Sequence, residues 1–299
     1  MKLHICNLLC FQHAAAAAAA PTNETDHLAL LKFKELIVSD PFSILTSWNN
    51  SIHFCNWLGV ACGPEHQRVT ALDLSGHTLS GSISPFIGDL SFLRSFDLRY
   101  NFLHDEIPQQ LTHLFRLQHL RLSSNLLTGK IPSNITNCPQ LENILFGMNK
   151  LNGNIPVELG YLKRFVWLDI FSNHLTRGIP PSPGNVSSLQ LLDFSLNNFV
   201  GNIPDEIGRL QRLVYLGVVD NNISGTFPYS LYNISTLMSI EAEGNRLKGT
   251  ILATISLTLP NLPMEMHSLV QSHFHFPMPL GSNHFISPMT ISWDKFQLI

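Results

Sequence analysis

Charged side chains are scarce in this 299-residue sequence. Asp, Glu, Lys and Arg together make up 13% of the residues, and the formal net charge at pH 7 is -3. A protein that binds nucleic acid or an anionic membrane through electrostatics needs a surplus of basic residues, and this sequence has none. Hydrophobic residues amount to 44%, and this content argues against a chain that is disordered throughout.

Recognisable catalytic motifs are also absent. The sequence contains no G-x-S-x-G nucleophile elbow, no glycine-rich phosphate loop and no Cys/His set at zinc spacing. Acidic residues do recur, and they could pass for general acid–base pairs. Their spacing follows a repeat that puts this column on the solvent face of successive strands, so we expect no enzymatic activity, no cofactor and no metal site. The recurring acids are Asp73, Asp97, Asp169, Asp193 and Glu241.

Long apolar runs are missing after the N-terminus. No later segment reaches the roughly 18 consecutive apolar residues of a membrane-spanning helix. The leader, residues 1–21, begins with Lys2 and ends in the alanine run Ala14–Ala20. This arrangement is typical of a secretory signal peptide with small residues at its cleavage site. Polar residues interrupt the apolar stretch, so an incorrectly assigned start is the alternative.

Cysteine is rare, with 5 residues in the chain. Cys6 and Cys10 lie in the leader, Cys138 stands alone, and Cys55 and Cys62 are near enough in sequence to close a small loop. Asn-x-Ser/Thr sequons accompany them, and together these features indicate an oxidising, secretory compartment. An Asn-rich repeat can also generate sequons by chance. The predicted N-glycosylation sites are Asn23, Asn49, Asn134, Asn185, Asn222 and Asn233.

One pattern dominates the sequence: L-x-x-L-x-L-x-x-N recurs every 24 residues. In that register an apolar residue follows the last position by two, Ile or Phe usually follows by six, and Pro usually follows by seven. A period of this length indicates a solenoid, in which each repeat buries its apolar residues against its neighbours. The last position, which we call the ladder position, falls at His77 and then at Asn101, Asn125, Asn149, Asn173, Asn197, Asn221 and Asn245.

The repeat predicts an α/β solenoid. Alternation such as Leu120-x-Leu122 marks a short strand with one buried face, and successive strands are expected to stack about 4.8 Å apart in a parallel sheet. Pro after Ile favours an extended back segment, and a short helical stretch such as Pro204–Leu210 then returns the chain to the next strand. Each ladder Asn is expected to point inward and to hydrogen-bond backbone groups of the turn.

These motifs resemble a known family. The repeat L-x-x-L-x-L-x-x-N-x-L-x-G-x-I-P is similar to the plant-specific class of leucine-rich repeats. The segment Asp26-His-Leu-Ala-Leu-Leu-Lys-Phe-Lys, then Trp48, then Cys55-Asn-Trp-Leu-Gly-Val-Ala-Cys62, resembles the N-terminal cap of plant leucine-rich repeat receptor-like kinases and receptor-like proteins. The resemblance spans about residues 24–262. It implies a right-handed superhelix with a concave parallel sheet, short 3-10 or helical return segments, a helical cap and a Cys55–Cys62 disulfide.

The domain organisation follows from the repeat and the cap. A solenoid needs a cap because its first repeat exposes an apolar edge, and the apolar run that could cover this edge is Leu28, Leu31, Phe33, Leu36 and Ile37. We expect a signal peptide at 1–21, the cap at 24–66, about eight repeats at 67–262 and a disordered, non-repeat tail at 263–299. We interpret His273-x-His275 in the tail as a chance feature of low-complexity sequence.

The candidate binding surface consists of the strand residues that alternate with the buried ones and face solvent. Large apolar side chains on such a face need a reason, and aromatic residues and Met are enriched at protein contacts. We hypothesise that this surface binds a peptide or protein, with the acidic column favouring basic groups; family drift without a ligand is the alternative. The predicted ligand-binding residues are Tyr100, Leu145, Met148, Trp167, Asp169, Phe171, Asp193, Leu196 and Tyr215.

The resemblance implies ligand recognition outside the cell. The chain is expected to act in the apoplast or at the cell surface, perceiving a peptide or protein in defence or development, with a leucine-rich repeat co-receptor as a second partner. Kinase activity and a membrane span would lie in parts that this chain lacks. Two alternatives are a secreted inhibitor of the polygalacturonase-inhibitor type and a non-functional, truncated receptor fragment whose tail is unrelated sequence.

Overall fold

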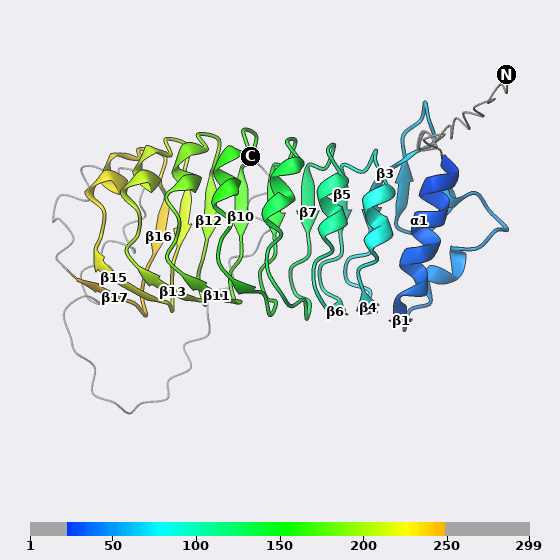
Figure 1. The fold of residues 1–299 in the computed structure, drawn as a ribbon, viewed down its shortest axis with the longest axis horizontal. Coiled ribbons are helices and arrows are strands. Elements are labelled where there is room, and N and C mark those ends of the chain that lie inside the picture. Colours follow the sequence, from blue (N-terminus) through cyan, green and yellow to red (C-terminus); the bar gives the residue numbers. More distant parts are fainter. Residues whose placement is uncertain (1–22, 249–299) are drawn as a thin grey trace, which may run out of the picture.

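The computed structural model describes residues 23–248, which form an elongated solenoid (Figure 1). Each 24-residue period makes one coil, built from a strand, a sharp turn, an extended back segment and a 3-10 helix that returns the chain. The predicted fold, a leucine-rich repeat superhelix, is confirmed. The predicted signal peptide 1–21, the predicted tail 263–299 and the final predicted repeat residues 249–262 lie outside the described residues.

The concave sheet has nine strands that stack in chain order. Strand β2 of the cap is antiparallel to β3, and all later neighbours are parallel. Leu72 pairs with Phe96, Phe96 with Leu120, and so on in steps of one repeat, so the sequence period is also the strand register. The strands are β2 (Val60–Cys62), β3 (Val69–Asp73), β5 (Ser95–Asp97), β7 (His119–Arg121), β8 (Asn143–Leu145), β10 (Trp167–Asp169), β12 (Leu191–Asp193), β14 (Tyr215–Gly217) and β16 (Ser239–Glu241).

The back segments pair as well, which the sequence analysis did not predict. Shortly after every ladder position except Asn125 the chain forms a second strand. Together with β1 of the cap, these strands line the lower edge in Figure 1 as a three-stranded and a five-stranded sheet. Single bridges at Glu106–Thr128 and Lys130–Asn152 span the gap between them. The strands are β1 (Ile37–Ser39), β4 (Ser80–Ser82), β6 (Phe102–His104), β9 (Asn152–Gly153), β11 (His174–Arg177), β13 (Asn198–Gly201), β15 (Asn222–Thr226) and β17 (Arg246–Lys248).

Short 3-10 helices form the convex side. Pro occupies the N-cap of most of them with φ near -62°, for example at Pro108 and Pro156, because its fixed φ suits the entry to a helix and it has no N–H to leave unpaired. Ser84 takes this place in the first coil, and its hydroxyl accepts from the Phe86 N–H. The helices are η3 (Pro85–Asp89), η4 (Gln109–His113), η5 (Ser133–Asn137), η6 (Val157–Tyr161), η7 (Ser182–Asn185), η8 (Asp205–Arg209) and η9 (Tyr229–Asn233).

The ladder asparagines hold each turn together. The side-chain nitrogen Nδ2 of Asn149 donates to the carbonyl oxygens of Leu122, Phe146 and Gly147, and its Oδ1 accepts from the Leu127 N–H. The same set of bonds recurs from Asn101 to Asn245. One amide therefore satisfies backbone groups of two successive coils that would otherwise lie unpaired in an apolar interior.

Replacing a ladder amide should cost more than its volume suggests. We expect Asn149→Leu to lower the free energy of unfolding by about 3 kcal/mol, because several buried backbone groups lose their partner together. Denaturant unfolding followed by far-UV circular dichroism measures the change. The matched control is Asn152→Leu, because Asn152 is exposed and lies three residues after Asn149. Equal unfolding midpoints for the two variants would contradict the structural role given to the ladder amide.

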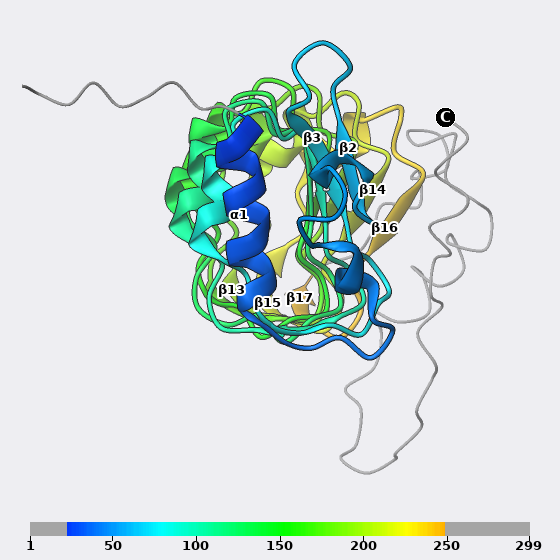
Figure 2. The ribbon, with the colours of Figure 1, turned by 90° about the vertical axis from the view of Figure 1, so that its right-hand side faces the viewer.

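The cap helix α1 (Asn23–Glu35) lies across the open end of the first coil (Figure 2). Its buried side chains are Asp26, Ala29, Leu30 and Phe33, which follow the i, i+3, i+4, i+7 spacing of one helix face. The apolar face expected from the sequence was therefore partly wrong. Phe33 is buried, but Leu28 and Leu36 are 53% and 40% exposed. Leu28 lies on another face of the helix, and Leu36 follows the last helical residue, Glu35.

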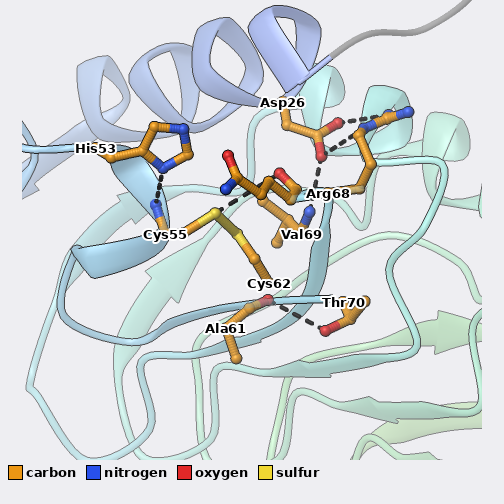
Figure 3. Close-up of a disulfide and its surroundings, with 9 residues drawn as sticks. Asp26, His53, Cys55, Ala61, Cys62, Arg68, Val69 and Thr70 are labelled. Atoms are coloured by element: carbon orange, nitrogen blue, oxygen red, sulfur yellow. Dashed lines mark hydrogen bonds and ion pairs between the residues drawn. A yellow bond between two sulfur atoms is a disulfide. The ribbon is translucent and has the colours of Figure 1, made fainter. Parts of the chain in front are cut away.

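A buried ion pair fastens the cap to the repeats (Figure 3). Arg68 Nη2 lies 2.7 Å from Asp26 Oδ1, Arg68 Nε lies 2.9 Å from Asp26 Oδ2, and the Val69 N–H donates to the same Oδ2. Asp26 is fully buried. The Arg68 guanidinium also lies over the ring of Phe92, at 4.6 Å from the centroid, so the contact links α1 to the first two coils.

The second cap contact is a disulfide beside a stack of tryptophans. Cys55 and Cys62 are bonded, with their Cα atoms 5.5 Å apart, as the resemblance implies. Trp48 and Trp57 stack at 5.4 Å between ring centroids, and their Nε1 groups donate to the Leu58 and Asn49 carbonyls. Closing this short loop stabilises the cap by about 2 to 3 kcal/mol in the chain-entropy view.

Breaking the Asp26–Arg68 pair from one side should be severe. We expect Asp26→Leu to cost about 3 to 5 kcal/mol, because it leaves a buried guanidinium without a counter-charge. Adding Arg68→Met should recover most of that loss, since two apolar side chains can fill the same space. Thermal unfolding of the two variants and of the parent chain tests this; a double variant no more stable than the single one would refute it.

Candidate ligand-binding surface

The outward side chains of the concave sheet form straight columns because the strands pair in register. Neighbouring members of a column come from consecutive repeats, about 4.8 Å apart. Side chains along a column therefore contact one another as well as solvent. The central column is Asp73, Asp97, Arg121, Leu145, Asp169, Asp193, Gly217 and Glu241.

Charged residues at the N-terminal end of this face neutralise one another. Arg99 Nη2 lies 2.8 Å from Asp97 Oδ2, and Arg121 Nη1 lies 3.7 Å from the same oxygen. Asp97 is only 3% exposed. The carboxylate that sequence alone placed on the solvent face is thus covered by two arginines, and this part of the face carries no free acid at Asp97.

The middle of the face is apolar. Met148 and Leu196 are 50% and 40% exposed, and Trp167 and Phe171 are half-buried. Phe171 leans over Gly147, where its Cδ1 lies 2.5 Å from the position a Cβ would take. Gly147 therefore makes room for the ring, a role that the repeat pattern did not signal.

Three of the predicted contact residues are less accessible than the sequence suggested. Leu145 is 4% exposed, Asp169 2% and Tyr215 6%. The reason is lateral packing: strands lie so close that a large side chain in one repeat covers a smaller one in the next. Alternation along a strand separates core from concave face, but it does not report how far a concave-face side chain is covered by its neighbours.

The residue before each ladder position has a positive φ, the left-handed region that favours glycine. Tyr100, Met148 and Leu196 occupy it at φ 58°, 55° and 54°, where a side chain costs about 1 to 2 kcal/mol. All three are substantially exposed, so the core gains little from them. The same position is filled elsewhere by Gly76, Ser124, Ser172, Asp220 and Gly244.

Acidic groups gather toward the C-terminal end of the face. Asp169 and Asp193 lie side by side in the register of adjacent strands. The Tyr215 hydroxyl donates to Glu241 Oε2 at 2.9 Å. Burial raises the pKa of Asp169 to about 8, and the charge of Asp193 adds to this effect. The hydrogen bond from the Phe171 N–H lowers the pKa by a smaller amount. Burial also raises the pKa values of Asp193 and Glu241, so this region binds protons more readily than free carboxylates do.

Stability should therefore depend on pH through Asp169. The folded-state pKa of Asp169 lies above the ordinary value of 3.8 for an aspartate, so the native state holds a proton that the unfolded chain releases. The resulting stabilisation is complete below about pH 4 and is lost as pH rises toward 8, at no more than about 1.4 kcal/mol per pH unit.

The variant Asp169→Asn should flatten this dependence and be more stable than the parent chain at pH 8. Unfolding midpoints measured from pH 4 to 8 would show the difference. The control is Asp73→Asn, which changes an exposed carboxylate in the same column that also accepts from a backbone N–H. Parallel pH profiles for Asp169→Asn and the parent chain would disprove the effect.

The sequons lie away from the concave strands among the described residues. All six asparagines are exposed. Asn23 begins α1, Asn49 is in the cap, Asn134, Asn185 and Asn233 are on the convex 3-10 helices, and Asn222 begins β15. Glycans on these residues would leave the concave face open, and we retain them as proposed sites.

Cys138 offers no nucleophile. The thiol is fully buried after η5, and its Sγ lies 3.5 Å from the Leu111 carbonyl oxygen. Burial raises the pKa of Cys138 to about 12, so the thiol stays protonated and packs as a small apolar residue. No three His, Cys, Asp or Glu side chains within residues 23–248 come together as metal ligands.

Two family descriptions match the chain. The Leucine rich repeat N-terminal domain matches residues 23–63, and the Leucine Rich Repeat matches residues 116–138 and 188–210. The first match covers most of the cap, and the second includes the ladder positions Asn125 and Asn197. The chain therefore combines a leucine-rich repeat N-terminal domain with leucine-rich repeats, and in this it is similar to plant leucine-rich repeat receptor-like kinases. The resemblance stated from the sequence is thereby confirmed, since relatives and solved structures agree with it.

Curated relatives of this leucine-rich repeat chain are plant receptor kinases. It is 48% identical over 111 residues to the LRR receptor-like serine/threonine-protein kinase EFR of Arabidopsis thaliana, covering 37% of this chain and 11% of EFR. It is 46% identical over 83 residues to the receptor kinase-like protein Xa21 of Oryza sativa subsp. japonica, covering 26% and 8%. The chain thus matches only a small part of each relative.

Solved structures similar to this chain include plant receptor ectodomains. HAESA of Arabidopsis, in complex with the peptide hormone IDA and the co-receptor SERK1, gives a TM-score of 0.71 at 31% identity, covering 78% of this chain and 40% of HAESA. The GASSHO1/SCHENGEN3 ectodomain of Arabidopsis thaliana, in complex with CASPARIAN STRIP INTEGRITY FACTOR 2, gives 0.69 at 32% identity, covering 79% and 32%. Within residues 23–248, no helix has the length and hydropathy of a membrane span.

Proposed function

We propose that this chain is an extracellular ligand-recognition module that perceives a peptide or protein in defence or developmental signalling. The observation that carries the proposal is the apolar middle of the concave face, where Met148, Trp167, Phe171 and Leu196 remain accessible although nothing in the fold requires large side chains there. Aromatic residues and Met supply contact area at little entropic cost, so they are the usual anchors of a protein interface.

The charges around this region suggest what the ligand carries. Asp97 is already neutralised by Arg99 and Arg121, whereas Asp193 and Glu241 have no basic partner within ion-pair distance among the described residues. A ligand with a basic group toward the C-terminal end of the face would supply the missing counter-charge. The solved relatives support this type of use, because HAESA is seen with a peptide hormone and a co-receptor; a leucine-rich repeat co-receptor is therefore the second partner that we propose.

The location proposed is the apoplast or the outer face of the plasma membrane. Support comes from the Cys55–Cys62 disulfide, which persists in oxidising compartments, and from sequons that are all exposed. The similarity of the chain to receptor ectodomain structures also supports an extracellular location.

Selection from a random peptide library on the immobilised, secreted chain tests the proposal. We expect enriched peptides with apolar anchors and at least one Lys or Arg. The variant Trp167→Ala/Phe171→Ala should weaken the selected peptides by about tenfold or more. Tyr161→Ala on η6, a 71% exposed aromatic residue outside the concave sheet, should leave their affinity unchanged.

The result that would overturn the proposal is a set of selected peptides that bind the double variant and the parent chain equally well. Thermal unfolding of each variant, compared with the parent chain, separates loss of binding from loss of fold.

A further inference from the structure

A row of basic residues occupies the edge where each 3-10 helix passes the chain to the next concave strand. These connectors run along the edge opposite the back strands, the upper edge in Figure 1. Glu142 is the acidic residue that they carry. The basic row, as we call it, consists of Arg94, Arg116, Lys163, Arg164 and Arg212.

The connectors stack as regularly as the strands. The Gln118 N–H donates to the Arg94 carbonyl at 2.8 Å, the Glu142 N–H donates to the Gln118 carbonyl, and the same bond recurs in each coil to Met238. Arg116, Arg164 and Arg212 hold the same place in every second repeat. They are therefore about 10 Å apart along a nearly straight line, which is twice the strand spacing.

These cations lack carboxylate partners. No ion pair joins any residue of the basic row to an acid within residues 23–248, whereas Arg68 and Arg99 are each paired. Arg94, Lys163, Arg164 and Arg212 are exposed. Arg116 is held in place by stacking over Phe92, with its Cζ 4.0 Å from the ring centroid. This local excess of positive charge is not evident from the net charge of the whole chain, which is -3.

The arrangement selects for an extended ligand. Donors that converge on one point bind a single anion, but donors spaced along a line do not; a linear polyanion can contact each of them in turn. Phe115 beside Arg116 is 49% exposed, but other exposed positions between the cations are polar, among them Ser187, Gln190 and Gln211. These polar side chains suit hydroxyl groups better than the apolar anchors of a protein partner. We propose that the basic row binds an acidic polysaccharide, a linear polymer of carboxylate-bearing sugars. This site is separate from the concave face and does not depend on a peptide ligand.

Binding of polygalacturonate to the secreted chain, with its glycans trimmed to the first sugar, tests the proposal. The variant Lys163→Gln/Arg164→Gln/Arg212→Gln should lower the association constant by roughly tenfold. It should also reduce the dependence of binding on salt, since fewer counterions are released from the polymer.

The matched control removes three exposed cations from the opposite side, Lys130→Gln/Lys150→Gln/Arg246→Gln, and should change binding less than twofold. Fully methyl-esterified polygalacturonate, which has the same backbone without charge, should not bind. Equal losses in the two triple variants would show non-specific attraction and overturn the proposal. Binding of polyglutamate as tight as that of polygalacturonate would overturn the choice of a polysaccharide.

Discussion

The sharp turn at the end of every concave strand is the constraint on which the solenoid depends. It leaves backbone N–H and C=O groups facing an interior that offers no water. A single amide per repeat resolves this, because the ladder asparagine accepts from the next segment of one coil and donates to carbonyls of two coils. Burial of the leucines supplies most of the stabilising free energy, whereas the ladder amides fix the position of the turn in each coil. Register, sheet and surface columns all follow from that repetition.

Much of the fold could be predicted from the sequence, because it repeats the same physical solution. The apolar period fixes the coil, the ladder amide fixes the turn, and Pro108 or Pro156 fixes the entry to each 3-10 helix. The back strands were missed, since their residues vary and their pairing comes from backbone stacking alone. The face of α1 was partly misjudged, because several apolar residues follow one another there and only the contact with the first coil decides which are buried.

The binding surface was less predictable than the fold. Periodicity assigns Trp167 and Phe171 to the concave side, but Gly147 decides where the Phe171 ring can lie. Likewise, alternation does not reveal that Asp97 is covered by Arg99 and Arg121, or that Asp169 is almost fully buried. These outcomes depend on side chains 24 residues apart that become neighbours only when coils stack. Net charge is equally uninformative about position, since a chain of charge -3 presents an unpaired basic row along one edge.

The burial of Cys138 has a consequence for how the chain reaches this structure. Its thiol is sealed inside the coil that contains η5 and stays protonated there, so it cannot exchange with the Cys55–Cys62 bond. Before that coil closes, the same thiol is accessible to the cap cysteines. Synthesis from the N-terminus brings the two cap cysteines out before Cys138. The order of residues along the chain therefore favours the Cys55–Cys62 pairing, and closure of the coil then removes Cys138 as an alternative partner.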